Sequence, residues 1–182
     1  MTADAAAIIA FWRDAGPQKW YAKDDAFDAE IRARFHPAHD AAARGELWGW
    51  ERDGDGALAL IILLDQFPRN LFRGSAHAFA TDGAAVGVAD RAIAQGFDAA
   101  REGLLRQFFY LPYMHSEDLA HQERCVTLCA SLGPGFEENH KFAVIHRDII
   151  ARFGRFPHRN AIFGRSTTAE EQAFLDAGGF AG

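Results

Sequence analysis

Lysine and cysteine are both scarce in this chain of 182 residues. Three of its 19 basic side chains are lysines and 16 are arginines, and the 25 acidic residues leave a formal net charge of −6. This negative balance argues against nucleic acid or an anionic membrane as a partner. The two cysteines, Cys125 and Cys129, stand four residues apart in one expected helix, so they are poor candidates for a disulfide and are expected in the core.

Long apolar segments and targeting signals are also missing. The longest stretch without aspartate, glutamate, lysine or arginine covers residues 125–136, which is shorter than the roughly 18 apolar residues of a membrane-spanning helix. The apolar residues 5–12 follow no lysine or arginine and are too few and too aromatic for a secretory signal. We therefore expect a cytoplasmic protein with no membrane partner.

The common catalytic motifs do not occur either. The chain contains no P-loop, no dinucleotide-binding glycine pattern, no nucleophile elbow and no zinc-protease helix motif. His121 lies on the same expected helix face as the two cysteines, but the three positions span about 12 Å, too far for one zinc ion. The sequence thus assigns no metal site by itself and leaves any cofactor unknown.

The composition is that of a globular protein with a large core. Hydrophobic residues make up 49% of the chain, and a chain of this length buries roughly 70% of its unfolded surface on folding. Apolar residues recur at helical spacing, and no segment shows the alternation of a strand. We predict a single all-α domain over residues 1–182, with seven to nine helices arranged in antiparallel hairpins.

Local signals place the first helices. Asp4 is expected to cap the first helix and Gly16 to stop it. A second helix is expected after Asp24, with a break or kink at Pro37. Residues 57–64 are apolar on every side and are assigned to a helix because alanine and leucine dominate.

The remaining helices are expected further along the chain. The patterns predict helices over residues 75–95, 101–110, 116–132 and 137–153, and a short one ending at residue 177. Ser116 is expected to cap the helix over residues 116–132, and Gly154 is expected to end the helix over residues 137–153. Thr167 and Glu170 form a capping-box pattern before the last.

Four polar segments lie beside strongly apolar helices. They are Asp65-Gln66 with Arg69, Asn70 and Arg73; His115 to Asp118; His146 with Arg147; and Arg155 with His158, Arg159 and Asn160. Asp65 ends an apolar run, so its carboxylate is expected to be buried and paired, with an arginine as its partner. His146 shares a helix face with Phe142 and Ile149 and is expected near the buried side. We predict that these segments converge.

For each segment, a purely structural interpretation has the same weight as a functional one. Asp65 and Gln66 would then cap or hydrogen-bond a loop, residues 116–118 would form an ordinary first helical turn, and the arginines would make internal ion pairs. Surface or hydrogen-bonded positions are expected for the other histidines examined, which are His36, His39, His77 and His121.

Two segments resemble each other within the chain. Residues 67–74, beginning Phe-Pro-Arg-Asn, are echoed by residues 156–165, beginning Phe-Pro-His-Arg-Asn. Duplicated helical hairpins would produce such an echo, but one pair does not establish a repeat array, which usually needs three or more units.

Three long motifs connect the chain to a known family. Leu63-Leu64-Asp65-Gln66-Phe67-Pro68-Arg69-Asn70-Leu71-Phe72-Arg73-Gly74, the Phe108 to Leu119 segment and the Arg152 to Asn160 segment resemble, in order, the signatures of the bacterial family DUF924. The resemblance covers nearly the whole chain. It implies an all-α fold of tetratricopeptide-like helical hairpins and supplies no reaction.

Two functional hypotheses follow. In the first, a small anionic molecule is bound by Arg69, Asn70, Arg73, Arg155, His158, Arg159 and Asn160, while Asp65, His115, Glu117 and His146 supply acid, base or ligand functions. One variant adds a divalent metal held by His115, Glu117 or Asp118, and His146. In the second hypothesis, helical hairpins form a groove for a peptide or partner protein. We favour the first because the polar motifs lie at helix junctions.

Overall fold

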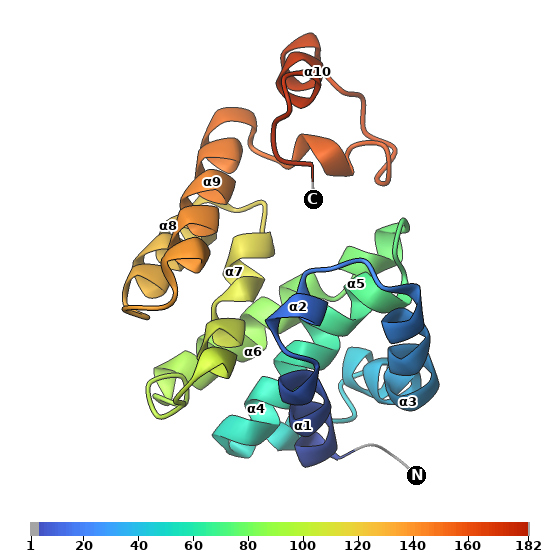
Figure 1. Cartoon of the computed structure of the whole chain (residues 1–182), viewed down its shortest axis with the longest axis vertical. Coiled ribbons are helices and arrows are strands. Elements are labelled where there is room, and N and C mark those ends of the chain that lie inside the picture. The colour runs from blue at the N-terminus through green and yellow to red at the C-terminus, as the bar shows by residue number, and fades with distance from the viewer. Residues whose placement is uncertain (1–3, 182) are drawn as a thin grey trace. The chain divides into compact units, whose positions relative to one another are not determined.

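The structure, a computed structural model, describes residues 4–181, and all regular elements in that range are helical (Figure 1). The α-helices are α1 (Ala5–Ala15), α2 (Pro17–Trp20), α3 (Asp25–Ala43), α4 (Gly54–Ile61), α5 (Phe67–Leu71), α6 (Asp82–Ala94), α7 (Leu111–His115), α8 (Leu119–Ala130), α9 (Glu137–Phe153) and α10 (Ala169–Asp176). The all-α class is confirmed. Ten α-helices in the described range exceed the expected seven to nine, because the short helices α2, α5 and α7 were not expected as separate elements.

The chain divides into two compact units, residues 1–112 and 113–182, with the boundary inside α7. We call them unit 1 and unit 2. Compactness alone does not decide whether two units unfold together. The expectation of a single domain therefore stays a prediction.

Unit 1 is built around α4, which buries every side chain from Ala57 to Ile61. Asp53 caps this helix by accepting a hydrogen bond from the Gly56 amide at 2.8 Å, and a π-helical turn, Ile62–Gln66, continues it into α5. The apolar run therefore forms a helix, as predicted. An aromatic group packs beside it, in which Trp12 contacts Trp20, Phe27, Phe67 and Phe108.

The cap predictions for the first two helices are confirmed, but the predicted effect of Pro37 is partly wrong. The side chains of Asp4 and Asp24 accept hydrogen bonds from the first turns of α1 and α3. α3 continues through Pro37 to Ala43 without a break. Phe35 and Ala38 are buried on either side of the proline. The burial of these two side chains compensates for the backbone hydrogen bond that the helix loses at the proline.

Several element boundaries differ from the predictions. The helix expected over residues 75–95 consists of a 3₁₀ turn, Ala76–Phe79, and α6, while residues 101–110 contain the 3₁₀ helix Leu104–Phe109. Asp118, not Ser116, caps α8, because the Asp118 carboxylate accepts from the Ala120 amide at 2.8 Å. The capping box before α10 is formed by Thr168 and Glu171, one residue later than expected.

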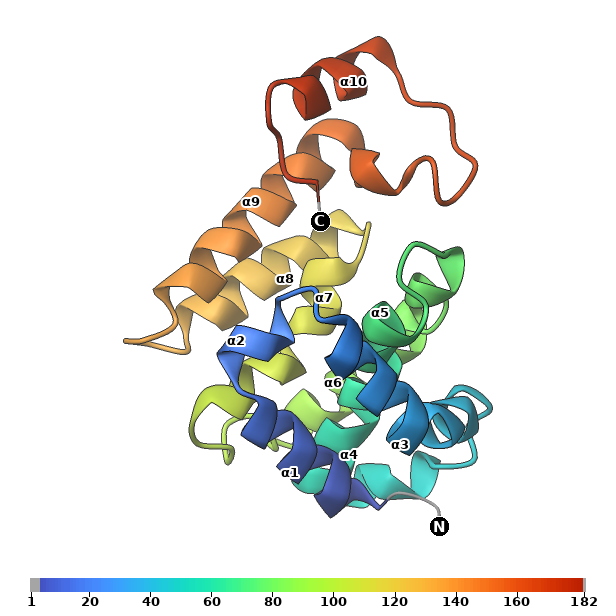
Figure 2. The ribbon, with the colours of Figure 1, turned by 45° about the vertical axis from the view of Figure 1, so that its right-hand side comes forward.

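Unit 2 contains an antiparallel hairpin of α8 and α9, which lie side by side in both views (Figures 1 and 2). Gly154 ends α9 as predicted, with a φ of 67° that favours glycine. Ile149, Ile150 and Phe156 form a buried cluster next to it. The sulfur atoms of the two cysteines lie 3.8 Å apart as buried free thiols, which confirms their predicted place in the core.

No helix between residues 4 and 181 has the length and apolar character needed to cross a membrane.

A substitution at Gly56 tests the packing of α4. A Cβ atom at this position would lie 2.0 Å from the Trp50 carbonyl oxygen, whereas a Cβ at Gly49 would meet nothing within 4 Å. We expect Gly56→Ala to lower the free energy of unfolding by about 1–3 kcal/mol and Gly49→Ala to change it by less than about 0.5 kcal/mol. Chemical denaturation measures both values, and equal effects would contradict the packing described.

Candidate functional site

The carboxylate of Asp65 is fully buried in the π-helical turn between α4 and α5. Arg69 Nη1 lies 3.4 Å from Asp65 Oδ1, and the side-chain Nε2 of Gln66 donates to Asp65 Oδ2 at 2.5 Å. The Arg69 guanidinium also donates to both carboxylate oxygens of Asp82 on α6, at 3.0 and 3.1 Å. Burial lowers the pKa of Arg69, but the two carboxylates outweigh it and raise the pKa overall. The predicted arginine partner of Asp65 is confirmed.

The π-helical turn leaves backbone carbonyl groups that side chains satisfy. Three successive carbonyl oxygens accept such bonds: Leu63 from His39 Nδ1 at 2.8 Å, Leu64 from Thr81 Oγ1 at 2.5 Å, and Asp65 from Arg69 Nη1. Burial lowers the pKa of His39. His39 is therefore a hydrogen-bonded structural residue, as predicted. Although π-turns recur at functional sites, this turn already has its partners inside unit 1.

Asn70 and Arg73 of the first Phe-Pro segment hold one carboxylate from α3. Asn70 Nδ2 donates to Asp28 Oδ1 at 2.7 Å, and Arg73 donates to the two Asp28 oxygens at 2.9 and 3.0 Å. The hydrogen bonds to Asp28 raise the pKa of Arg73. These contacts fasten α5 to α3, which agrees with the interpretation as internal ion pairs.

In unit 2, Asn160 of the second Phe-Pro segment and Arg155, which precedes that segment, hold one carboxylate from α10. Arg155 donates to the two carboxylate oxygens of Glu171 at 2.6 and 2.9 Å, and Asn160 Nδ2 lies 3.3 Å from Glu171 Oε2. The bonds from Arg155 lower the pKa of Glu171 to about 2. The echo therefore extends to the asparagine, which faces a carboxylate of another helix in each segment, but not to its arginine partner, because Arg73 lies after Asn70 and Arg155 lies before residues 156–165.

Glu117 joins the start of α8 to the second Phe-Pro segment. Its carboxylate accepts from Arg165 Nη1 at 2.6 Å and Nη2 at 2.9 Å, and from the Phe156 amide at 2.9 Å. Burial raises the pKa of Glu117, but the bonds from Arg165 and Phe156 outweigh it and lower the pKa overall. Glu117 is thus ionised and held in an ion pair at neutral pH, and its acid–base role stays a prediction.

Arg159 connects the end of α7 to an aromatic ring. Its side chain is buried, its Nη1 donates to the His115 carbonyl oxygen at 2.9 Å, and its guanidinium carbon lies 4.4 Å from the centre of the Phe156 ring. A cation over a phenyl face is stabilised by the ring's negative face. Arg159 therefore places a positive charge beside Phe156.

Two histidines and two phenylalanines of unit 2 form what we call the histidine cluster: His146, His158, Phe156 and Phe180. The His146 ring centre lies 5.4 Å from that of Phe156 and 4.4 Å from that of Phe180. For His158 the same distances are 5.6 and 5.5 Å. Both imidazoles therefore contact the same pair of phenyl rings.

The backbone fixes how the two imidazoles are protonated. His146 Nδ1 lies 2.8 Å from the Phe142 carbonyl oxygen, which can only accept, so Nδ1 carries the proton and Nε2 is an acceptor. His158 makes a hydrogen bond to the backbone of Phe180, while its Nδ1 is buried without a partner among the described residues.

Both imidazoles are neutral at pH 7. Burial lowers the pKa of His146 to about 4; the bond to Phe142 opposes this effect, and the nearby His115 and Arg159 add to it. Burial and then the charge of Arg159 lower the pKa of His158 to about 4. The predicted burial of His146 is confirmed, with 6% of the residue exposed.

Residues 156–165 also bury polar atoms that have no hydrogen-bond partner in the part of the chain that the structure describes. They are His158 Nδ1, Asn160 Oδ1 and Arg165 Nε. Buried polar atoms are rarely left unpaired in native proteins, so such atoms require an explanation. Three of them in one ten-residue segment mark it as the candidate site.

The predicted site residues fall into two groups. Asp65, Arg69, Asn70 and Arg73 form a network in unit 1, and His115, Glu117, His146, Arg155, His158, Arg159 and Asn160 belong to unit 2. Convergence of all of them in one pocket stays a prediction. Within residues 4–181 no three His, Cys, Asp or Glu side chains gather as metal ligands do, so the metal variant has no matching cluster there.

The site predictions omitted Glu171 and Phe180. Glu171 lies within the pattern expected for a helix start, but that pattern does not reveal that its carboxylate faces Arg155. Phe180 follows two glycines, and a Cβ at Gly179 would lie 2.6 Å from the Phe174 carbonyl oxygen. The small residue lets the chain pass Phe174 closely before Phe180 reaches the histidines. No sequence signal points to this contact.

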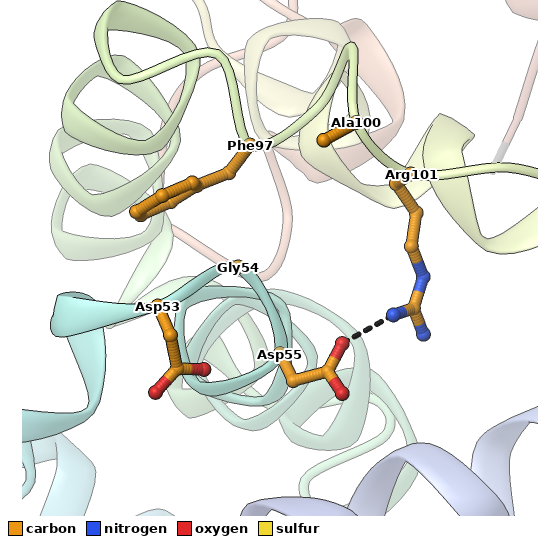
Figure 3. A pocket seen from close by; sticks show the side chains of 6 residues that line it. All are labelled: Asp53, Gly54, Asp55, Phe97, Ala100 and Arg101. Carbon is orange, nitrogen blue, oxygen red and sulfur yellow. Dashed lines mark hydrogen bonds and ion pairs between the residues drawn. The ribbon is translucent and has the colours of Figure 1, made fainter.

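A hollow of about 340 Å³ in unit 1 was not predicted either. Asp53, Gly54 and Asp55 line it from the start of α4, and Phe97, Ala100 and Arg101 from the chain after α6 (Figure 3). Arg101 pairs with Asp55 across it, and Asp53 is occupied in capping α4. Its charged groups thus have partners within unit 1, unlike the unpaired atoms of residues 156–165.

Comparison with known proteins places the chain. The family model described as a bacterial protein of unknown function, DUF924, matches residues 8–179. The chain belongs to this family. A similar solved structure is that of the protein of unknown function ATU0120 from Agrobacterium tumefaciens, which is 53% identical, with 95% of this chain and 97% of that chain covered and a TM-score of 0.91. No curated protein matches this DUF924 chain.

Removing the Phe180 ring tests what keeps the histidines of this DUF924 chain neutral. Burial is the largest cause of the low pKa values, about 4, of both His146 and His158. We expect Phe180→Ala to hydrate both imidazoles and to raise both pKa values toward the ordinary 6.5. A pH titration of the imidazole resonances by NMR measures them.

Leu119→Ala is the control, because Leu119 is a 41% exposed apolar residue of the same unit, at the start of α8 and outside residues 156–165. It should leave both pKa values within a few tenths of the wild-type values. Unchanged pKa values in Phe180→Ala would show that Phe180 does not shield the imidazoles.

Proposed function

We propose that the histidine cluster and the arginines beside it bind a small anionic ligand. The observation that carries the proposal is the set of three buried, unpartnered polar atoms in residues 156–165. A ligand with hydrogen-bonding groups would satisfy atoms that the described chain does not.

The charges around the cluster favour an anion. Arg159 lowers the pKa of both His146 and His158, so the electrostatic potential at both rings disfavours positive charge. The same potential stabilises negative charge. Arg159 and the Nε–H of Arg165 are suited to the task, since guanidinium N–H groups form directed hydrogen bonds to carboxylate and phosphate oxygens. The two Nη atoms of Arg165 already hold Glu117.

The low pKa values favour binding over acid–base catalysis. A general base works best when its pKa lies near the working pH, and His146 and His158 have pKa values of about 4. Asp65 and Glu117 are held in ion pairs with Arg69 and Arg165. The acid–base roles of Asp65, His115, Glu117 and His146 therefore stay predictions, and the proposed function is ligand binding.

The second candidate is a tetratricopeptide-like module for a peptide or partner protein. The α8–α9 hairpin supports it, because stacked helical hairpins are the units of such modules. We rank it lower because three buried unpartnered polar atoms lie in the segment after α9, whereas the hairpin holds one, Gln122 Oε1 of α8. The cytoplasmic location also stays a prediction.

Anion titrations test the proposed function. Isotope-labelled protein is titrated at pH 7 with inorganic phosphate, acetate and succinate while the imidazole resonances of His146 and His158 are followed by NMR. We expect saturable shifts with at least one of these anions. Arg159→Gln should weaken that affinity at least about tenfold, because a hydrogen bond to a charged group contributes about 1.5–3 kcal/mol.

Arg152→Gln is the matched control. Arg152 pairs with Glu170 and is 52% exposed, so its loss should leave anion affinity unchanged. Circular dichroism shows whether each variant is folded. The absence of a saturable response to all three anions would contradict the proposed function.

A further inference from the structure

We propose that the ligand of the histidine cluster is a small hydroxy acid, whose anionic group faces the guanidinium groups and whose hydroxyl group donates its one hydrogen bond to His158 Nδ1. This inference rests on the proposed function of the same site and specifies the chemistry of its ligand.

The imidazoles require a hydrogen-bond donor. His146 donates Nδ1–H to the Phe142 carbonyl, which leaves Nε2 as its acceptor, and His158 Nδ1 is buried without a partner among residues 4–181. Neutral imidazole nitrogens of this kind accept hydrogen bonds and repel the oxygens of an anion. A simple anion would therefore pair with guanidinium groups and leave His158 Nδ1 without a hydrogen bond.

The donor should be a hydroxyl group and not an ammonium group. The Arg159 guanidinium lies 4.4 Å from the Phe156 ring, which contacts both imidazoles, so an added positive charge at this place is repelled. An ammonium group carries the same charge as an imidazolium and meets the same repulsion. A hydroxyl group donates a hydrogen bond without a charge.

The phenyl rings indicate which part of the ligand joins its anionic group to its hydroxyl group. Phe156 and Phe180 each contact both imidazoles, and Arg159 lies on the Phe156 ring. The imidazole rings thus pack against the same pair of phenyl rings, and the Arg159 guanidinium packs against one of that pair. A short carbon skeleton bearing both an anion and a hydroxyl group fits this arrangement.

Three ligands of matched size separate these features. Lactate, alanine and propionate carry a hydroxyl, an ammonium and a hydrogen at the same carbon, next to the same carboxylate. Their dissociation constants are measured at pH 7 by NMR titration of the wild-type protein. We expect lactate to bind at least about tenfold more tightly than propionate and alanine, the effect of one hydrogen bond to a buried acceptor.

A second pair distinguishes the two kinds of anion. The dissociation constants of 2-hydroxyethyl phosphate and ethyl phosphate show whether a hydroxyl group also strengthens the binding of a phosphate. A hydroxyl preference in either pair supports the proposal, and the pair that binds more tightly identifies a carboxylate or a phosphate ligand.

His158→Phe tests the source of the preference, because it keeps an aromatic ring and removes both ring nitrogens. We expect the ratio of the affinities within the preferred pair to fall toward one. His77→Phe, an exposed histidine of unit 1, is the control and should keep the wild-type ratio. The wild-type comparison decides the matter even where the variant does not fold.

The outcomes separate this inference from the proposed function. Equal binding of the hydroxylated and unsubstituted acids would overturn the hydroxy-acid inference and leave anion binding intact. Tighter binding of alanine than of lactate would overturn it as well. If none of the five compounds binds, and inorganic phosphate, acetate and succinate also fail, the proposed function falls together with the inference.

Discussion

Pairing between guanidinium and carboxylate groups is the interaction that connects the polar segments of this chain to its helices. Four such pairs join separate segments: Asp82 with Arg69, Asp28 with Arg73, Glu117 with Arg165 and Glu171 with Arg155. A guanidinium can hold both oxygens of a carboxylate while it remains charged, which an ammonium group does less well. The excess of arginine over lysine in an acidic chain thus has a structural reason at these positions. The bonds from Arg165 and Arg155 lower the pKa values of Glu117 and Glu171, so these two carboxylates are ionised at neutral pH.

The histidine cluster follows a different rule. Its imidazoles are buried against Phe156 and Phe180 and are neutral, so they need no counterion. They do need hydrogen-bond partners, and the backbone supplies one for each ring. The nitrogens left over are the chemically available groups of unit 2. The site therefore has acceptors from histidine and donors from arginine, which is why its proposed ligand carries both kinds of group.

The sequence predicted correctly those features that depend on residues close together in the chain. Asp4 and Asp24 cap helices and Gly154 stops one because each acts within a few positions of itself. It also predicted that Asp65 is buried and paired. Long-range partners were not predictable: Glu171 and Phe180 reach the site only through the path of the chain after α9. Helix boundaries shifted by one or two residues where several polar residues competed to cap, as Ser116 and Asp118 do.

The protonation of His146 is the most direct test of this account. Nitrogen-15 NMR of the wild-type protein at pH 7 reports whether each ring nitrogen carries a proton. The account predicts a neutral ring with the proton on Nδ1 and a bare Nε2, because Nδ1 bonds to the Phe142 carbonyl and burial keeps the pKa near 4. A ring protonated on both nitrogens, or a neutral ring with its proton on Nε2, would contradict it.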